Sequence, residues 1–278
     1  MRIPDWIVLT AILGVVLWAL FSGARKADAP EAPPPEITGV DTPLLQGPNP
    51  FDEEVLVQIG DVSDGVGTAF SLDRDNGVWV TAKHVVDGCA RVGLLYGGGR
   101  VLMIDRQNVV TSPDSDVAIL KTRRAPHSLN FMEEGELRLN QSGFHIGYPQ
   151  GEPGEVTSRL LSRSRLITRG RYRADESVLA WAEMGRTRGI NGSLAGISGA
   201  PVFDQNGNVL GVTVAESPRR GRIYTAAPES LSQILDDNAI KLNVGETFPI
   251  GISTYGQEGD RLRRELAVVK VICRAQNS

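Results

Sequence analysis

The chain has 278 residues, 41% of them hydrophobic and 22% charged, which is the composition of a globular protein and excludes wholesale disorder. The formal net charge of −4 argues against nucleic-acid binding through overall charge, so no nucleic-acid partner is expected. Two cysteines are too few for a four-cysteine zinc site or a dense disulfide framework, and 31 glycines indicate many tight turns.

The first 50 residues fall into two segments of unusual composition. Residues 6–22 form an uncharged, mostly apolar run, and a helix of that length spans about 25 Å, close to the ~30 Å core of a membrane. Seven of the residues from 24 to 50 are proline, a content that favours an extended tether. We therefore predict a transmembrane signal-anchor over residues 1–23, a Pro-rich linker over residues 24–50 and a folded domain over residues 51–278.

A cleaved signal peptide is the alternative interpretation of the apolar run. Two small-x-small triplets, at 22–24 and 27–29, follow the run, as a cleavage site requires. The residues directly after these triplets are Arg25 and Pro30, and proline is unfavourable at that position. The anchor is therefore preferred, whereas cleavage would leave a secreted or periplasmic protein.

Beyond Phe51 the apolar runs are short and bounded by turn residues. The runs that predict strands are 54–59, 67–72, 78–82, 92–96, 116–120, 144–148 and 209–214. Helical patterns cover only 82–87 and 228–237, and the weak alternation over 267–273 predicts one more strand. Many short strands separated by turns are typical of an antiparallel sandwich or barrel.

Three positions stand out within this pattern. His84 lies where a strand runs into a helical turn, Asp116 enters an apolar strand, and Ser198 lies in a turn framed by glycines. Acyl transfer by serine needs these three types, because an imidazole must take the hydroxyl proton and a carboxylate must orient the imidazole. Glycines beside the serine let two backbone N–H groups point at the developing oxyanion.

The segments around these positions resemble the motifs of trypsin-like serine peptidases, specifically the compact bacterial HtrA/Deg-like branch. The segments are Thr81-Ala82-Lys83-His84-Val85-Val86, Asp116-Val117-Ala118-Ile119-Leu120 and Gly196-Ile197-Ser198-Gly199-Ala200-Pro201. The resemblance covers about residues 54–238. It implies an all-β fold of two antiparallel six-stranded β-barrels with a short C-terminal helix. The sequence departs from the HtrA proteases in one respect: the 38 residues after Ile240 are too few for the PDZ domain that those proteases carry, so none is expected.

The resemblance also implies the roles of the site residues. His84, Asp116 and Ser198 are expected to be catalytic, with the N–H groups of Gly196 and Ser198 as the oxyanion hole. No metal and no cofactor is required. Ala200 replaces the second glycine of the serine motif, and we expect its small methyl group to leave activity intact.

The family resemblance places the substrate pocket around Gly192, Thr213, Val214 and Glu216. Gly192 stands at the position where specificity for lysine or arginine places an aspartate. Without that buried carboxylate, a small or apolar P1 residue is expected. Glu216 is expected either to narrow or acidify the pocket rim or to be a solvated residue at a strand end.

Two further features leave alternatives open. Cys89 and Cys273 are the two cysteines, and they either form a disulfide in an oxidising compartment or remain buried free thiols. Arginines at odd positions from 163 to 173 share one face of a strand, either as a solvated face that protects an edge or as an anionic surface site.

The sequence thus predicts a membrane-tethered serine endopeptidase that hydrolyses protein or peptide substrates. Its expected location is the bacterial inner membrane, crossed once by the N-terminal helix, with the catalytic domain in the periplasm. The alternative function is a catalytically silent, protease-like binding or regulatory module at the membrane.

Overall fold

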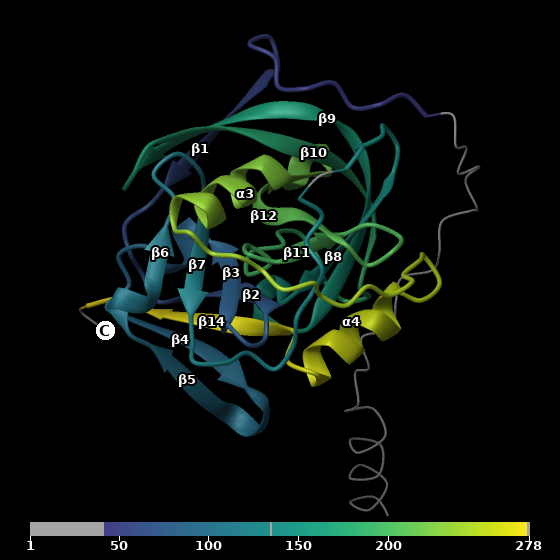
Figure 1. Ribbon diagram of the computed structural model, residues 1–278. Coiled ribbons are helices and arrows are strands. Elements are labelled where there is room, and N and C mark those ends of the chain that lie inside the picture. The colour runs from purple at the N-terminus through teal and green to yellow at the C-terminus, as the bar shows by residue number, and fades with distance from the viewer. Residues whose placement is uncertain (1–41, 134, 277–278) are drawn as a thin grey trace, which may run out of the picture.

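The computed structural model describes residues 42–133 and 135–276, in which strands predominate (Figure 1). The strands are β1 (Glu53–Ile59), β2 (Gly65–Asp73), β3 (Val78–Ala82), β4 (Arg91–Tyr96), β5 (Arg100–Ile104), β6 (Val109–Thr111), β7 (Val117–Lys121), β8 (Ser142–Gly147), β9 (Gly154–Gly170), β10 (Ala174–Arg186), β11 (Pro201–Phe203), β12 (Val209–Ser217), β13 (Arg222–Ala226) and β14 (Val268–Arg274). The helices in the described ranges are α2 (Lys83–Val86), α3 (Pro228–Asp237) and α4 (Tyr255–Arg264). The predicted β-rich class is therefore confirmed.

The first sheet has seven strands in the order β5-β4-β14-β2-β3-β7-β6, all paired antiparallel. The predicted strand near the C-terminus is β14, and it lies between β4 and β2 in the middle of this sheet. The last strand of the chain therefore completes a sheet that is otherwise built from the N-terminal half.

The second sheet contains a closed ring of six strands. Its order is β1-β9-β10-β13-β12-β11-β8, and an additional pairing of β8 with β9 closes the ring. Strand β1 joins the outside of the ring by a parallel pairing with β9, from Glu53 opposite Ser164 to Ile59 opposite Gly170. Each sheet thus has seven strands where six were expected, and within the described residues the first sheet stays open, since its edge strands β5 and β6 do not pair with each other.

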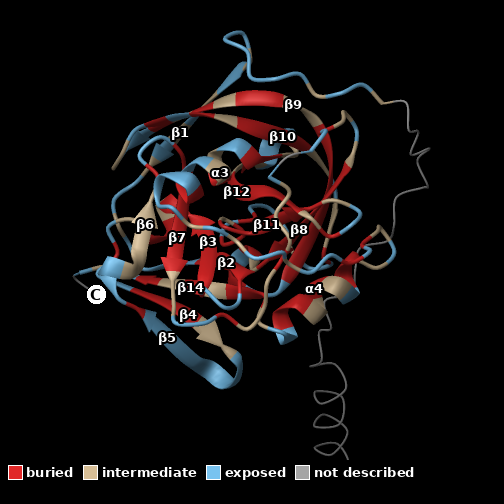
Figure 2. Cartoon of the chain, viewed as in Figure 1, coloured by how far each residue is buried: buried red, intermediate tan, exposed pale blue. Residues whose placement is uncertain are grey.

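The core lies between and inside the two sheets. Trp79 on β3 and Trp181 on β10 are fully buried, and β3 is buried at every position, as its valine and tryptophan side chains favour. Figure 2 shows the buried strands at the centre and the exposed strand β5 projecting from one end. This rigid double sheet supports the loops between strands, where the candidate site residues are found.

The expected single C-terminal helix is replaced by two helices followed by a strand. Helix α3 begins at Pro228, as predicted, because a first-turn proline needs no hydrogen-bond acceptor for its nitrogen. Helix α4 was not predicted, since its sequence is polar and contains two glycines. It buries Tyr255 and Leu262, and its Arg263 forms an ion pair with the fully buried Glu155 of β9.

The described fold begins before Phe51. The N–H of Leu45 donates to the carbonyl of Leu137, and the N–H of Leu139 donates to the carbonyl of Pro43. Leu45 also packs against a cluster of buried apolar residues. The end of the predicted linker, residues 42–50, therefore lies against the domain because it carries an apolar pair among its prolines. The predicted anchor and the rest of the linker lie outside the described residues.

Candidate active site

The first sheet brings His84 and Asp116 together. Strand β3 ends at Ala82, which pairs with Val117 at the start of β7. His84 lies two residues beyond Ala82, on the single-turn helix α2, and Asp116 directly precedes Val117. The imidazole Nδ1 of His84 lies 2.6 Å from the Asp116 carboxylate, and the backbone N–H of His84 donates to the same carboxylate at 2.8 Å.

The environment of this pair suits a histidine that acts as a base. Burial lowers the pKa of His84, but the charge of Asp116 and the hydrogen bond to it outweigh burial, so the net pKa is raised; nearby Arg171 opposes that rise. A carboxylate only accepts hydrogen bonds, so Nδ1 carries a proton toward Asp116 and Nε2 of the neutral ring is left to accept one.

Ser198 lies in a loop in which successive backbone N–H groups alternate between having an acceptor and having none. The N–H groups of Ile197 and Gly199 donate to the carbonyls of Leu194 and Thr213, at 2.9 and 2.7 Å. In contrast, the N–H groups of Gly196 and Ser198 have no acceptor within the described part of the chain. Two unpaired donors beside a serine are the arrangement that an oxyanion hole requires.

Two glycines of this loop adopt backbone conformations that a side chain would prevent. Gly196 has φ of +98°, and a Cβ there would lie 2.5 Å from the carbonyl oxygen of Tyr148. Gly199 has φ of +88°, and a Cβ there would lie 2.0 Å from the carbonyl oxygen of Thr68. Ala200, which replaces a glycine of the family motif, does not have positive φ, so its methyl group is accommodated.

The hydroxyl of Thr68 on β2 ties the serine loop to the first sheet. It donates to the carbonyl of Gly196 at 2.9 Å and accepts the N–H of Tyr148 at 3.1 Å. The N–H of Thr68 donates to the carbonyl of Ser198 at 2.8 Å. These bonds place the loop of the second sheet opposite His84 of the first.

His84 and Ser198 line one cleft of about 570 Å³ together with Gly196, Val214 and Glu216. Among the described residues no hydrogen bond joins the side chains of His84 and Ser198. Residues 57–61, which end β1 and follow it, also line the cleft.

The structure separates the four predicted pocket residues into two pairs. Val214 and Glu216 line the cleft, and the Glu216 carboxylate accepts the N–H of Leu194 at 2.9 Å, so it is not merely a solvated residue at a strand end. Thr213 is buried and its hydroxyl lies 3.1 Å from His145 Nδ1, while Gly192 is exposed and lies outside the cleft lining.

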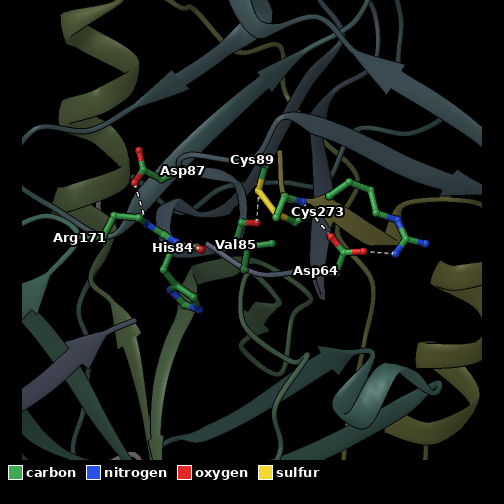
Figure 3. Close-up of a disulfide and its surroundings, with 9 residues drawn as sticks. Asp64, His84, Val85, Asp87, Cys89, Arg171 and Cys273 are labelled. Atoms are coloured by element: carbon green, nitrogen blue, oxygen red, sulfur yellow. Dashed lines mark hydrogen bonds and ion pairs between the residues drawn. A yellow bond between two sulfur atoms is a disulfide. The ribbon is translucent and has the colours of Figure 1, made fainter. Parts of the chain in front are cut away.

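A disulfide joins Cys89 and Cys273 beside helix α2, with Cα atoms 5.6 Å apart (Figure 3). It links the loop after α2 to β14, and Cys273 also lines the cleft. The bond therefore ties the loop after the short helix that carries His84 to β14, an interior strand of the first sheet.

Sequence reasoning missed three residues near Asp116. The hydroxyl of Tyr172 donates to Asp116, Arg171 donates to the carbonyl of His84, and the buried carboxyl of Glu176 accepts the N–H of Asp116. Arg171 belongs to the odd-numbered arginines, three of which form ion pairs: Arg163, Arg165 and Arg171. The one sequence feature that could have indicated the contact with Asp116 is the tyrosine in the polar turn among these arginines.

The other two histidines have structural partners. His145 lies 2.9 Å from the hydroxyl of Ser158, and burial lowers its pKa to about 3, so it is neutral. His127 lies 3.0 Å from Glu246. Across residues 42–133 and 135–276, no group of three or more His, Cys, Asp and Glu side chains is arranged to hold a metal ion.

Comparison with known proteins identifies relatives of this domain. The family model of the trypsin-like peptidase domain matches residues 67–212. A DegP-like periplasmic serine endoprotease of Bartonella henselae is 33% identical over 165 residues, which cover 58% of this chain and 30% of the relative. The periplasmic serine endoprotease DegP of Escherichia coli K12 is 25% identical over 221 residues, 73% of this chain and 46% of the relative.

These matches span less than half the length of either relative. Among solved structures, the active form of the Rv3671c protease from M. tuberculosis is similar over 68% of this chain and 84% of that chain, with 21% identity and a TM-score of 0.48.

Within the described residues, the helices are all too short or too polar to cross a membrane.

Proposed function

Because the chain belongs to the family of the trypsin-like peptidase domain, we propose that it is a serine endopeptidase that hydrolyses protein or peptide substrates through an acyl-enzyme. One observation carries the proposal. His84, which is hydrogen-bonded to Asp116, shares a cleft with Ser198, whose own N–H and that of Gly196 are left without acceptors among the described residues.

In the first half of the reaction, Oγ of Ser198 attacks the carbonyl carbon of the scissile bond while Nε2 of His84 takes the hydroxyl proton. The substrate oxygen becomes an oxyanion, which the N–H groups of Gly196 and Ser198 stabilise. Asp116 holds the ring and stabilises the imidazolium. His84 then donates its proton to the departing amine, and an ester of Ser198 remains.

In the second half, a water molecule replaces the amine. His84 removes a proton from the water as it attacks the ester carbonyl, and then returns a proton to Oγ of Ser198 as the acid product leaves. No hydrogen bond joins the side chains of His84 and Ser198 among the described residues, and catalytic hydrogen bonds of this kind commonly tighten only when substrate binds.

We also propose that the P1 residue of the substrate is small or apolar. Gly192 supplies no carboxylate, and the carboxylate of Glu216 is engaged by the N–H of Leu194. A cationic side chain would need a free buried counter-charge. A peptide-library cleavage profile tests this point, and a profile led by arginine at P1 would refute it and implicate Glu216.

We further propose the arrangement of the whole chain. Residues 1–23 anchor it in the inner membrane, residues 24–50 form the linker that ends against the domain, and residues 51–278 form a trypsin-like protease domain in the periplasm, with the open first sheet as the counterpart of the first six-stranded barrel. The relatives from Bartonella and Escherichia coli are named as periplasmic, which supports the compartment. The apolar run at residues 6–22 supports the anchor.

A fluorophosphonate probe tests the chemistry, since only an activated serine reacts rapidly with it. We expect the wild-type chain to be labelled on Ser198, and the variants Ser198→Ala and His84→Ala to lose both labelling and peptide hydrolysis, because triad members act as a unit. Ser232→Ala, on α3, is the matched control and should react like the wild type. Hydrolysis that persists in Ser198→Ala would refute the assignment, and a folded wild type without labelling would favour a silent module.

A further inference from the structure

The tip of the β9–β10 hairpin, residues 170–173, reaches the His84–Asp116 pair from the second sheet. Strands β9 and β10 have 17 and 13 residues and are the longest strands in the described ranges. Parallel pairing of β1 with β9 continues as far as Gly170. The end of the hairpin, from Ser164 to the tip, is therefore supported by a third strand.

Tyr172 at this tip completes the hydrogen bonding of Asp116. The phenol donates to Oδ1 of Asp116 at 2.6 Å, the same oxygen that accepts the N–H of His84 at 2.8 Å. The other oxygen, Oδ2, lies 2.6 Å from Nδ1 of His84. The Asp116 side chain is 1% exposed, so Tyr172 is the side-chain donor that holds Oδ1 away from the imidazole.

The tip is itself attached to both ends of helix α2. Arg171 donates from Nε to Asp87 at 3.0 Å and from Nη2 to the carbonyl of His84 at 2.8 Å. Figure 3 shows Arg171 beside Asp87 and His84. At the start of the helix, the ammonium group of Lys83 lies 4.3 Å from the centre of the Tyr172 ring. Three independent contacts thus fix the distance between the phenol and the helix that carries His84.

We propose that Tyr172 is a positioning residue of the proteolytic site, which orients the Asp116 carboxylate toward His84 and moderates its charge. The inference rests on the proposed function. Burial, and next to it the charge of Asp116, raise the pKa of Tyr172, so the phenol remains a hydrogen-bond donor throughout the working pH range. Tyr172 is absent from the cleft lining, so it acts through Asp116 and not on the substrate.

The test replaces Tyr172 by phenylalanine in the full-length chain. The ring and its contact with Lys83 are retained, and only the hydroxyl is lost. Without that donor the Asp116 charge acts more strongly on the imidazolium, so the acid limb of kcat/KM against pH moves to higher pH. We expect kcat to fall by roughly tenfold, as for one hydrogen bond to a charged group, with KM unchanged. Tyr96→Phe removes a tyrosine hydroxyl that is not hydrogen-bonded to Asp116, from a ring that packs against Trp79, and is the control.

A proton NMR titration of the His84 ring gives a readout that does not depend on turnover. The titratable and charged groups that face His84 and its surroundings are Asp116, Lys83, Asp87, Arg171 and the buried carboxyl of Glu176, and all of them are retained in Tyr172→Phe. We expect the pKa of His84 to be higher in Tyr172→Phe than in the wild type, with the thermal midpoint of unfolding little changed.

The proposal is overturned if the pH profile and the His84 titration of Tyr172→Phe both superimpose on those of Tyr96→Phe. Ser198→Ala, assayed in parallel, separates this failure from a failure of the proposed function. If Ser198→Ala still hydrolyses peptides, the proposed function is wrong, while the His84 titration continues to test the link from Tyr172 to Asp116.

Discussion

Replacing Glu176 by glutamine should make the protein more stable at alkaline pH. The Glu176 side chain lies behind Asp116, where it is 5% exposed. One of its oxygens accepts the N–H of Asp116 at 2.7 Å, and the other lies 3.3 Å from the hydroxyl of Ser230. Glutamine has the same shape, and its amide oxygen and NH₂ group can make both contacts without a charge.

The magnitude follows from the pKa of the buried carboxyl. Burial, and after it the charge of Asp116, raise the pKa of Glu176 from 4.5 to about 8. Because the folded-state pKa is raised, the stabilising contribution of the protonated group is complete below pH 4.5 and is lost as the pH rises to about 8. That interval corresponds to a loss of about 5 kcal/mol in the free energy of unfolding. Glutamine does not ionise, so the variant escapes this loss.

The assay is urea unfolding of the full-length chain at about pH 5, 7 and 9, values that bracket the raised pKa, in a Ser198→Ala background that prevents self-cleavage. We expect the stability of the Glu176→Gln variant, relative to the parent chain, to increase with each step in pH. Glu152→Gln, at an exposed position, is the control and should show no such trend. Parallel stability curves for the parent chain and the Glu176→Gln variant across this range would refute the reasoning.

Three further substitutions test the fold around the site. Arg263→Met leaves the buried carboxylate of Glu155 without its partner, so we expect a loss of about 3–5 kcal/mol in urea unfolding, and an unchanged midpoint would mean that the pair is not buried as described. Replacing Cys89 and Cys273 by serine opens a loop with a sequence separation of 184 residues, for which chain entropy predicts a loss of up to about 5 kcal/mol. The same thermal midpoint in the double variant and in the oxidised wild type would contradict that expectation. Gly199→Ala places a methyl group against the carbonyl of Thr68 at φ of +88°, so we expect at least ~1–3 kcal/mol of destabilisation together with loss of Ser198 labelling; normal labelling of a stable variant would show that the loop tolerates a side chain.

Much of the site could be read from local patterns. His84, Asp116 and Ser198 each lie at a boundary where an apolar strand meets a turn or short helix. Such boundaries can be predicted from sequence because a buried strand is a short run of apolar residues that ends at turn-forming residues. The need for glycine at position 199 also follows from local motif chemistry, and the structure supplies its cause in the close approach of the Thr68 carbonyl.

Sequence alone left the partners across the fold undecided. Tyr172 contacts Asp116 from 56 residues away, and the Cys89–Cys273 bond spans a separation of 184 residues. Neither segment identifies its distant partner. The sequence pattern around a residue predicts whether the residue is buried, but it does not predict which distant residue will contact it.

The position of β14 and the docking of Leu45 have the same origin. A weakly alternating segment near the C-terminus predicts a strand. Its place between β4 and β2 is decided by the tertiary structure, in which these two strands offer their edges to a strand from the other end of the chain. Leu45 lies in a Pro-rich stretch that predicts a tether, and it is held by the carbonyl of Leu137 and by an apolar cluster formed elsewhere. The sequence by itself determined the strand-rich class and the three residues proposed to do the chemistry, whereas long-range packing decided which side chains contact them.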